Sequence, residues 1–222
     1  MKPPFDTRHL FSSLALFGIM GLNSWTYGQT LDIGADEFVD LIGQDMRYAE
    51  PYRDISIHDG GRLRVDELDW LNDPFASPQP ASITVTGTNS LLETRLFQSN
   101  DSNDNNTLFL RFGTTGVKDG GRISAWQSFL YGTVIDVENG IFDSGIALSL
   151  APDSTGKATL LTASNSVIAA SNGRLSSDVE LSSGSRMWLA TSNIGGDFGR
   201  GEVTLSGNST LGIGTTKVTL DS

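Results

Sequence analysis

The sequence predicts an all-β fold, a right-handed parallel β-helix (solenoid) with about four repeats of near-40 residues. The first observation is a set of apolar stretches whose closing leucines lie 39, 40 and 39 residues apart: Leu71, Leu110, Leu150 and Leu189. The second is the alternation of apolar and hydroxyl side chains in segments such as 83–86 and 203–206. The third is the abundance of glycine, 25 residues against 7 prolines, which suits a chain that turns often between short strands.

The first 28 residues are expected to be a signal peptide that forms a helix. Lys2 and Arg8 supply positive charge, and residues 10–22 form an apolar run shorter than the ~18 residues of a spanning helix. Small residues flank Tyr27, which favours cleavage after Gly28. An N-terminal membrane anchor is the alternative.

The charge of the mature chain argues against some classes of partner, and its lack of cysteine argues against one class of fold. Cleavage removes two basic residues and one acidic residue, which changes the formal net charge from −11 to −12. Such a chain repels nucleic acid and anionic lipid. No cysteine is present, which excludes a disulfide scaffold. We expect export through the bacterial periplasm to the extracellular space or the cell surface, with a mature chain that does not span the membrane.

Residues 29–59 repeat least and are expected to form an N-terminal cap or linker. Within this segment, residues 35–44 place Phe38, Leu41 and Ile42 on one helical face, which predicts a short helix.

Residues 60–222 are expected to form the repeat domain. Its alternating strands bury Ile83, Val85, Val203 and Leu205 and turn the residues between them toward water. A small polar turn follows each such strand, at Asn89-Ser90, Gln127-Ser128, Asn165-Ser166 and Asn208-Ser209. Asparagines at equivalent turns can stack as a hydrogen-bonded ladder. Two coils per unit give roughly eight coils. A β-propeller or a sandwich is the alternative architecture.

Two stretches, Gly201–Ser209 (GEVTLSGNS) and Ser82–Ser90 (SITVTGTNS), resemble the passenger repeats of bacterial autotransporters. The resemblance covers residues 60–222 and implies a non-catalytic, adhesin-like protein associated with the outer membrane. An autotransporter continues into a membrane β-barrel, whereas this sequence stops at Ser222 within the repeat pattern. We therefore expect a longer protein, tethered through a C-terminal barrel or anchor, or a second subunit that covers this end. A truncated fragment without independent activity is a further alternative.

The alternative function is that of a carbohydrate-active β-helix enzyme, a polysaccharide lyase or glycosidase. Such enzymes need carboxylates roughly 5–9.5 Å apart on one face. The residues to consider are Asp143, Asp153, Asp197 and Glu202. They occupy unlike positions of different units, which favours solvating acids, and we assign no catalytic residue.

The sequence predicts no cofactor and no defined metal site. Residues 100–106 (NDSNDNN) are rich in oxygen ligands for calcium but lack the spacing of a calcium loop, as does the single Gly195–Gly199 segment. His58 is the only histidine after Gly28, which argues against zinc. Residues 113–121 lack the Gly-Lys-Ser/Thr ending of a phosphate loop.

Three tryptophans, Trp70, Trp126 and Trp188, suggest a face that stacks on sugar rings, with packing at coil corners as the alternative. Trp70 and Trp188 precede a repeat leucine by one residue, so alternation turns them outward. The expected partner is carbohydrate or protein at a cell surface.

Overall fold

The computed structural model describes residues 29–41, 46–47, 52–65, 68–69, 82–94, 107–110, 113–195 and 201–218. Over these ranges every regular element is a β-strand. No helix in this described portion is long and apolar enough to cross a bilayer. The predicted signal peptide, the oxygen-rich segment 100–106, Trp70 and Asp197 lie outside the described residues.

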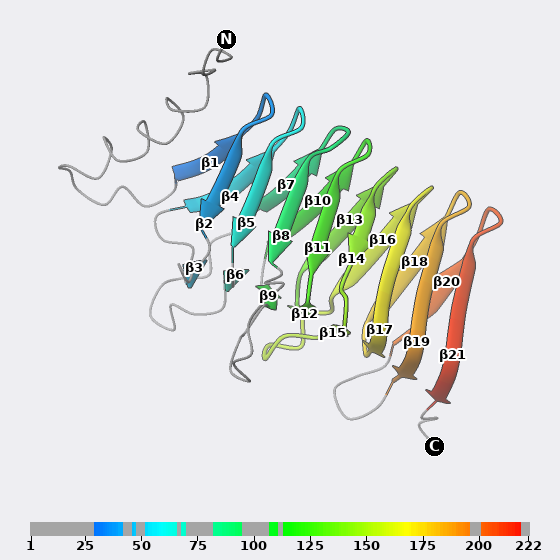
Figure 1. Ribbon diagram of the computed structural model, residues 1–222. Helices are drawn as coiled ribbons and strands as arrows, with labels where there is room; N and C mark the ends of the chain where they lie inside the picture. Colours follow the sequence, from blue (N-terminus) through cyan, green and yellow to red (C-terminus); the bar gives the residue numbers. More distant parts are fainter. Residues whose placement is uncertain are drawn as a thin grey trace, which may run out of the picture.

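Two parallel sheets run along the molecule (Figure 1). Sheet A has one strand from each coil, in the order β1 (Gln29–Ile33), β4 (Tyr52–Ile57), β7 (Ser82–Thr86), β10 (Thr114–Lys118), β13 (Val134–Glu138), β16 (Leu160–Ser164), β18 (Asp178–Ser182) and β20 (Val203–Leu205). Each of these strands pairs in parallel with the equivalent strand of the next coil.

Sheet B follows sheet A in every coil. Its first row is β2 (Phe38–Leu41), β5 (Arg62–Val65), β8 (Leu91–Thr94), β11 (Arg122–Ala125), β14 (Ile141–Asp143), β17 (Val167–Leu175), β19 (Arg186–Ile194) and β21 (Thr210–Val218). A second row is β3 (Met46–Arg47), β6 (Leu68–Asp69), β9 (Thr107–Leu110), β12 (Gln127–Tyr131) and β15 (Ala147–Ala151). Strand β17 pairs with both β14 and β15, so the later coils join the two rows in one strand of 9 residues.

The described strands therefore form eight coils, and the parallel pairing confirms the predicted β-helix over a propeller or sandwich, whose strands are antiparallel. Residues 29–41 already supply the first strand of each sheet, because β1 pairs with β4 and β2 with β5.

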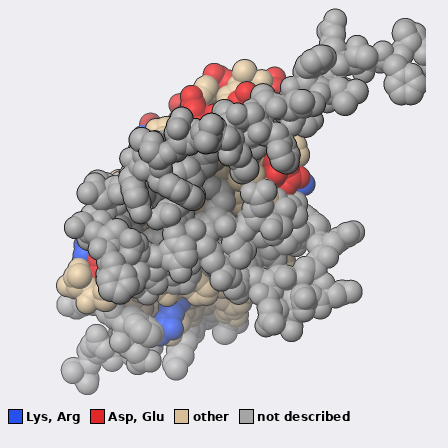
Figure 2. Space-filling model, turned by 90° about the vertical axis from the view of Figure 1, so that its left-hand side faces the viewer, with Lys and Arg blue, Asp and Glu red and all other residues tan. Residues whose placement is uncertain are grey.

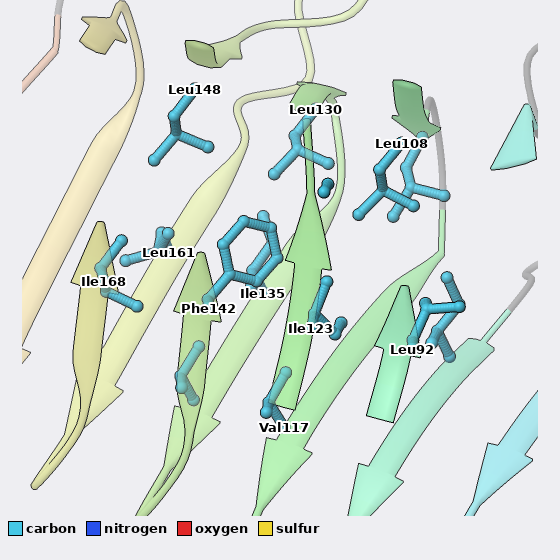
Figure 3. Packing of buried hydrophobic residues seen from close by; sticks show 14 of the residues in the cluster. Leu92, Leu108, Val117, Ile123, Leu130, Ile135, Phe142, Leu148, Leu161 and Ile168 are labelled. Carbon is cyan, nitrogen blue, oxygen red and sulfur yellow. The ribbon is translucent and has the colours of Figure 1, made fainter. Parts of the chain in front are cut away.

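The core consists of columns of inward side chains at matching positions of successive coils (Figure 3). In sheet A one column contains the fully buried Ile83, Ile135, Leu161 and Val179. In sheet B the facing column contains Leu92, Ile123, Phe142 and Ile168. Each apolar side chain packs against its neighbours one coil away, ~4.8 Å along the axis, so one core continues along the whole stack of coils.

The predicted inward residues Ile83 and Val85 are fully buried, and Val203 packs against the core. Leu205 shares the register of the buried Leu181 but is 47% exposed. It lies on β20, the last sheet A strand in the described part of the chain, and is covered from one side only.

The connection from sheet A to sheet B is a tight turn in every coil. Each turn contains at least one residue with positive φ, among them Asp59, Asn89, Asn139, Asn165 and Asn208. Asparagine and glycine tolerate this conformation best. The side chain of Asn165 donates to that of Asn139 at 2.7 Å, so the predicted asparagine ladder is confirmed between these two coils.

The last residue of each such turn is small where the coils pack closely. A Cβ on Gly121 would lie 2.3 Å from the Val85 carbonyl oxygen, and one on Gly61 would lie 2.4 Å from that of Ile33. Serine occupies the position in other coils, where the buried Ser166 hydroxyl accepts from the Gly140 N–H and donates to the Val137 carbonyl.

Two sequence expectations are wrong. The helix predicted over 35–44 is a turn at Ala35-Asp36 followed by strand β2, which pairs with β5. The alignment of the four sequence repeats is also wrong in two of them, because it equates residues that lie in different parts of the coil. Gln127-Ser128 is not a turn but the start of β12, and Leu189 lies in the first row of sheet B, whereas Leu110 and Leu150 lie in the second.

Candidate interaction surface

The carboxylates considered for catalysis lie on separate elements. Asp143 ends β14 and forms an ion pair with Arg122 at 3.0 Å. Asp153 lies beyond β15, and Glu202 lies exposed just before β20 in the other sheet. Over the described ranges no three histidine, cysteine, aspartate or glutamate side chains gather as a metal site would require.

Asp153 stabilises its own loop. One carboxylate oxygen accepts from the Thr155 hydroxyl at 2.6 Å, the Thr155 N–H at 2.8 Å and the Lys157 N–H at 3.0 Å. Burial by itself would raise the pKa of Asp153, but these hydrogen bonds outweigh it and lower the pKa below the ordinary value.

His58 links the first two coils. Its Nε2 lies 3.1 Å from an Asp32 carboxylate oxygen and its Nδ1 lies 2.9 Å from one of Asp59. The hydrogen bond to Asp59 is the main cause that raises the pKa of His58, with a further contribution from the charge of Asp32. Gly34 makes room for the ring, since a Cβ there would lie 2.4 Å from its Cε1.

The outer face of sheet A is acidic. Its strands have six carboxylates among the side chains that the structure describes: Asp32, Asp54, Asp136, Glu138, Asp178 and Glu180. One lysine, Lys118, accompanies them, and it forms ion pairs with Asp136 at 3.1 Å and Glu138 at 3.7 Å. Hydroxyl groups of serine and threonine occupy most of the remaining outward positions, but two adjacent ones hold Val134 and Leu160.

The outer face of sheet B is basic. All arginines with described side chains lie on its strands: Arg62, Arg64, Arg122, Arg174 and Arg186. Its three described carboxylates are each within ion-pair distance of an arginine: Asp40 and Glu93 of Arg64, and Asp143 of Arg122. Arg62 and Arg186 have no ion pair with any described residue, so the face retains positive charge although the chain has a net charge of −11.

The turns that join sheet A to sheet B also contain acidic side chains. Asp36, Glu37, Asp59 and Asp119 lie in the first four turns. In Figure 2 acidic side chains gather along the upper edge of the molecule, the side on which Figure 1 draws these turns. Acidic and basic groups are thus segregated around the circumference of the solenoid.

Sheet B also exposes apolar side chains. Ile141, Val167 and Arg186 occupy one outward column on adjacent strands, and Trp188 lies two residues after Arg186 on β19. The exposed fractions are 37% for Ile141, 42% for Val167 and 60% for Trp188. These three apolar residues, together with Arg186, are called the Trp188 patch below.

The Trp188 ring rests on the neighbouring coil. Gly212 is its register partner on β21, and a Cβ there would lie 2.4 Å from Cε3 of the ring. The missing side chain of Gly212 therefore leaves the space that the indole occupies. The predicted outward direction of Trp188 is confirmed, whereas Trp126 is half-buried at the bend between β11 and β12.

Ile141, Val167 and Arg186 were not predicted as surface residues, although the sequence contains a signal for them. Each follows the small residue that closes the turn: Gly140-Ile141, Ser166-Val167 and Ser185-Arg186. Because the strand starts there, the residue after the glycine or serine faces outward and the next faces the core.

Comparison of the chain with protein-family models, curated proteins and solved structures finds no match. The fold, the charge distribution and the Trp188 patch are therefore the features that indicate a function.

Proposed function

We propose that this chain is a secreted or cell-surface interaction protein, similar to an autotransporter passenger and without catalytic activity. The observation that carries the proposal is the Trp188 patch, in which apolar side chains stay open to water beside an arginine that has no ion pair with any described residue. Exposed apolar groups gathered in one place mark interaction sites in soluble proteins. A repetitive flat face also allows many weak contacts to add up along one partner.

The export part of the proposal rests on residues 1–28 and on the acidic, cysteine-free remainder of the chain. The protein then passes through the periplasm to the outside of the cell, released or tethered at the outer membrane. Fusing residues 1–28 to a reporter enzyme that needs disulfides to fold tests this step. We expect an active reporter, and an inactive reporter that stays in the cytoplasm would contradict export.

The enzyme alternative is weakened by the contacts of its carboxylates, since Asp143 is engaged by Arg122 and Asp153 by its own loop. Incubating the full chain with acidic and neutral polysaccharides and assaying new chain ends separates the two functions. We expect no cleavage. Cleavage that is lost in Asp143→Asn or Asp197→Asn would replace the proposal with a lyase or glycosidase.

The interaction itself is tested by binding of the labelled full chain to bacterial cells, epithelial cells and mucin-coated surfaces. We expect saturable binding to at least one of them, and at least a tenfold loss in the double variant Ile141→Ser, Val167→Ser. Val134→Ser is the matched control, because Val134 is 36% exposed at an outward position of sheet A. Equal loss in the control, or full binding by the double variant, would contradict the assignment to sheet B.

A further inference from the structure

We propose that Trp188 and Arg186 form a binding site for an acidic saccharide, with a pyranose ring on the indole and its carboxylate on the guanidinium. This inference rests on the proposed function of the sheet B face and specifies the class of its partner. A sugar of the uronic acid type combines the two properties that the site requires, an apolar C–H face and a negative charge beside it.

The indole provides the stacking surface. With 60% of its surface exposed and its ring against Gly212, Trp188 is held in place and still open to solvent. The faces of aromatic rings carry partial negative charge and attract the weakly positive C–H groups of a sugar ring. The Gly212 backbone beneath the ring limits its movement, so less side-chain entropy is lost on binding.

Arg186 provides the charge. It precedes Trp188 by two residues on β19, and both side chains are exposed on the same face. Two residues of a strand span about 6.6 Å, close to the width of a pyranose with its carboxylate. A guanidinium without an ion pair can bind a carboxylate through two parallel hydrogen bonds.

The surroundings favour an acidic ligand at this position. The register neighbours of Arg186 are Val167 and Thr210, and those of Trp188 are Ala169 and Gly212, none of which is charged. The unpaired carboxylates of the described strands lie on sheet A. A negative ligand is therefore attracted to this part of sheet B and repelled from the opposite face.

Two exposed polar side chains, Thr191 and Asn172, follow further along β19 and β17. The Thr191 hydroxyl contacts the Asn172 side-chain oxygen, and the Asn172 amide donates to the Ile146 carbonyl at 3.0 Å. Both side chains are exposed, and their mutual contacts fix their orientation. Along β19 they lie on the side of Trp188 away from Arg186, where a saccharide longer than one residue would extend.

The test is calorimetric titration of the full chain with galacturonate trimer and with neutral galactose trimer, at low and high salt. We expect the acidic trimer to bind at least ten times more tightly than the neutral one, with affinity that falls as salt increases. Trp188→Ala should weaken both ligands at least tenfold, and Trp188→Phe should restore part of the loss. Arg186→Ala should remove the preference for the acidic trimer and leave the weak neutral binding unchanged.

Arg62→Ala is the matched control, because Arg62 occupies the same outward column on β5, several coils from Trp188. Its affinity should equal that of the unmodified chain. No binding of the acidic trimer, full binding by Trp188→Ala, or equal loss in Arg62→Ala would overturn the site. If the site fails while Ile141→Ser, Val167→Ser still abolishes surface binding, the proposed function stands with another class of partner.

Discussion

The two sheets share one core and one axial spacing, yet their outer faces differ in chemistry. Sheet A presents carboxylates and hydroxyl groups with a single described lysine, whereas sheet B presents arginines and exposed apolar side chains. The inward residues of both sheets are mostly aliphatic and nearly all fully buried. The outward residues of a solenoid can therefore vary to suit a binding partner, while the inward columns that stabilise the fold stay the same. We expect inward substitutions to change stability much more than outward ones.

The largest effect is expected from truncating the shared core. Phe142 on sheet B is fully buried, and Phe142→Ala should lower the free energy of unfolding by about 3–5 kcal/mol. Ile135→Ala on sheet A should cost about 2–5 kcal/mol for the same reason. Ile141→Ala, one residue before Phe142 on the outer side, should cost less than about 1 kcal/mol. Chemical denaturation measures all three, and an equal cost for Ile141 and Phe142 would contradict the separation.

A smaller effect is expected where the two sheets meet. Gly121→Ala places a Cβ against the Val85 carbonyl, which cannot move without shifting the coil below, and should cost about 1–3 kcal/mol. Gly116→Ala is the control in the same coil, because the nearest atom to its Cβ is the flexible Lys118 side chain at 3.8 Å. That control should be neutral or slightly stabilising, and thermal unfolding compares the pair. If both variants melt alike, the close approach at the turn is wrong.

Replacing a threonine of sheet A should affect stability differently at an inner and an outer position. Unlike the substitutions above, the inner replacement should raise the free energy of unfolding. Thr115 is 1% exposed between Ile83 and Ile135, and its hydroxyl has no hydrogen-bond partner among the residues that the structure describes. Thr115→Val should therefore stabilise the protein by about 1 kcal/mol, since a buried unpaired hydroxyl is costly. Thr84→Val, on the outer side of β7, should change stability by less than about 0.5 kcal/mol. Destabilisation by Thr115→Val would show that this hydroxyl is paired.

The smallest effect is expected from pH at the edge of sheet A. Because the pKa of His58 is raised in the folded state, its contribution to stability is complete below the ordinary pKa of 6.5 and disappears as pH rises through the folded-state pKa. The stability lost in His58→Gln should therefore be largest in mild acid and vanish in mild alkali. Denaturation of both proteins across this pH range provides the measurement, and a difference that grows with pH would contradict the ion pairs.

Much of the fold followed from local patterns in the sequence. Alternation placed Ile83 and Val85 inside and Trp188 outside. The period near 40 residues corresponds to two coils from Leu110 to Leu150. It corresponds to only one coil from Leu68 to Leu108, which are direct register partners, so the prediction of two coils per unit is wrong there. The phase of the repeat did not follow, because the turns between the sheets vary in length. The Asn139-Gly140 turn has two residues, whereas the Gly87–Ser90 turn has four. The alternating pattern of a short strand fits a strand of either sheet equally well. For this reason Gln127-Ser128 was aligned with the turns although it begins a strand of sheet B.

The Trp188 patch could be predicted only in part. The outward direction of Trp188 is a property of its own strand, but its neighbours Val167 and Gly212 come from other coils. Their approach depends on the register between strands whose paired residues lie 19 and 24 residues apart in the sequence, which no local pattern specifies. The helix predicted over 35–44 failed for a related reason, because pairing of β2 with β5 overrides a weak helical periodicity.

The most direct test of the account is side-chain footprinting of the full chain, free and bound to a surface that it recognises. We predict that Trp188, Ile141 and Val167 on sheet B are protected from labelling in the bound state. Val134 and Leu160, the apolar residues on the outer face of sheet A, should be labelled equally in both states. Protection of Val134 and Leu160 without protection of Trp188 would contradict the central claim that sheet B is the binding face.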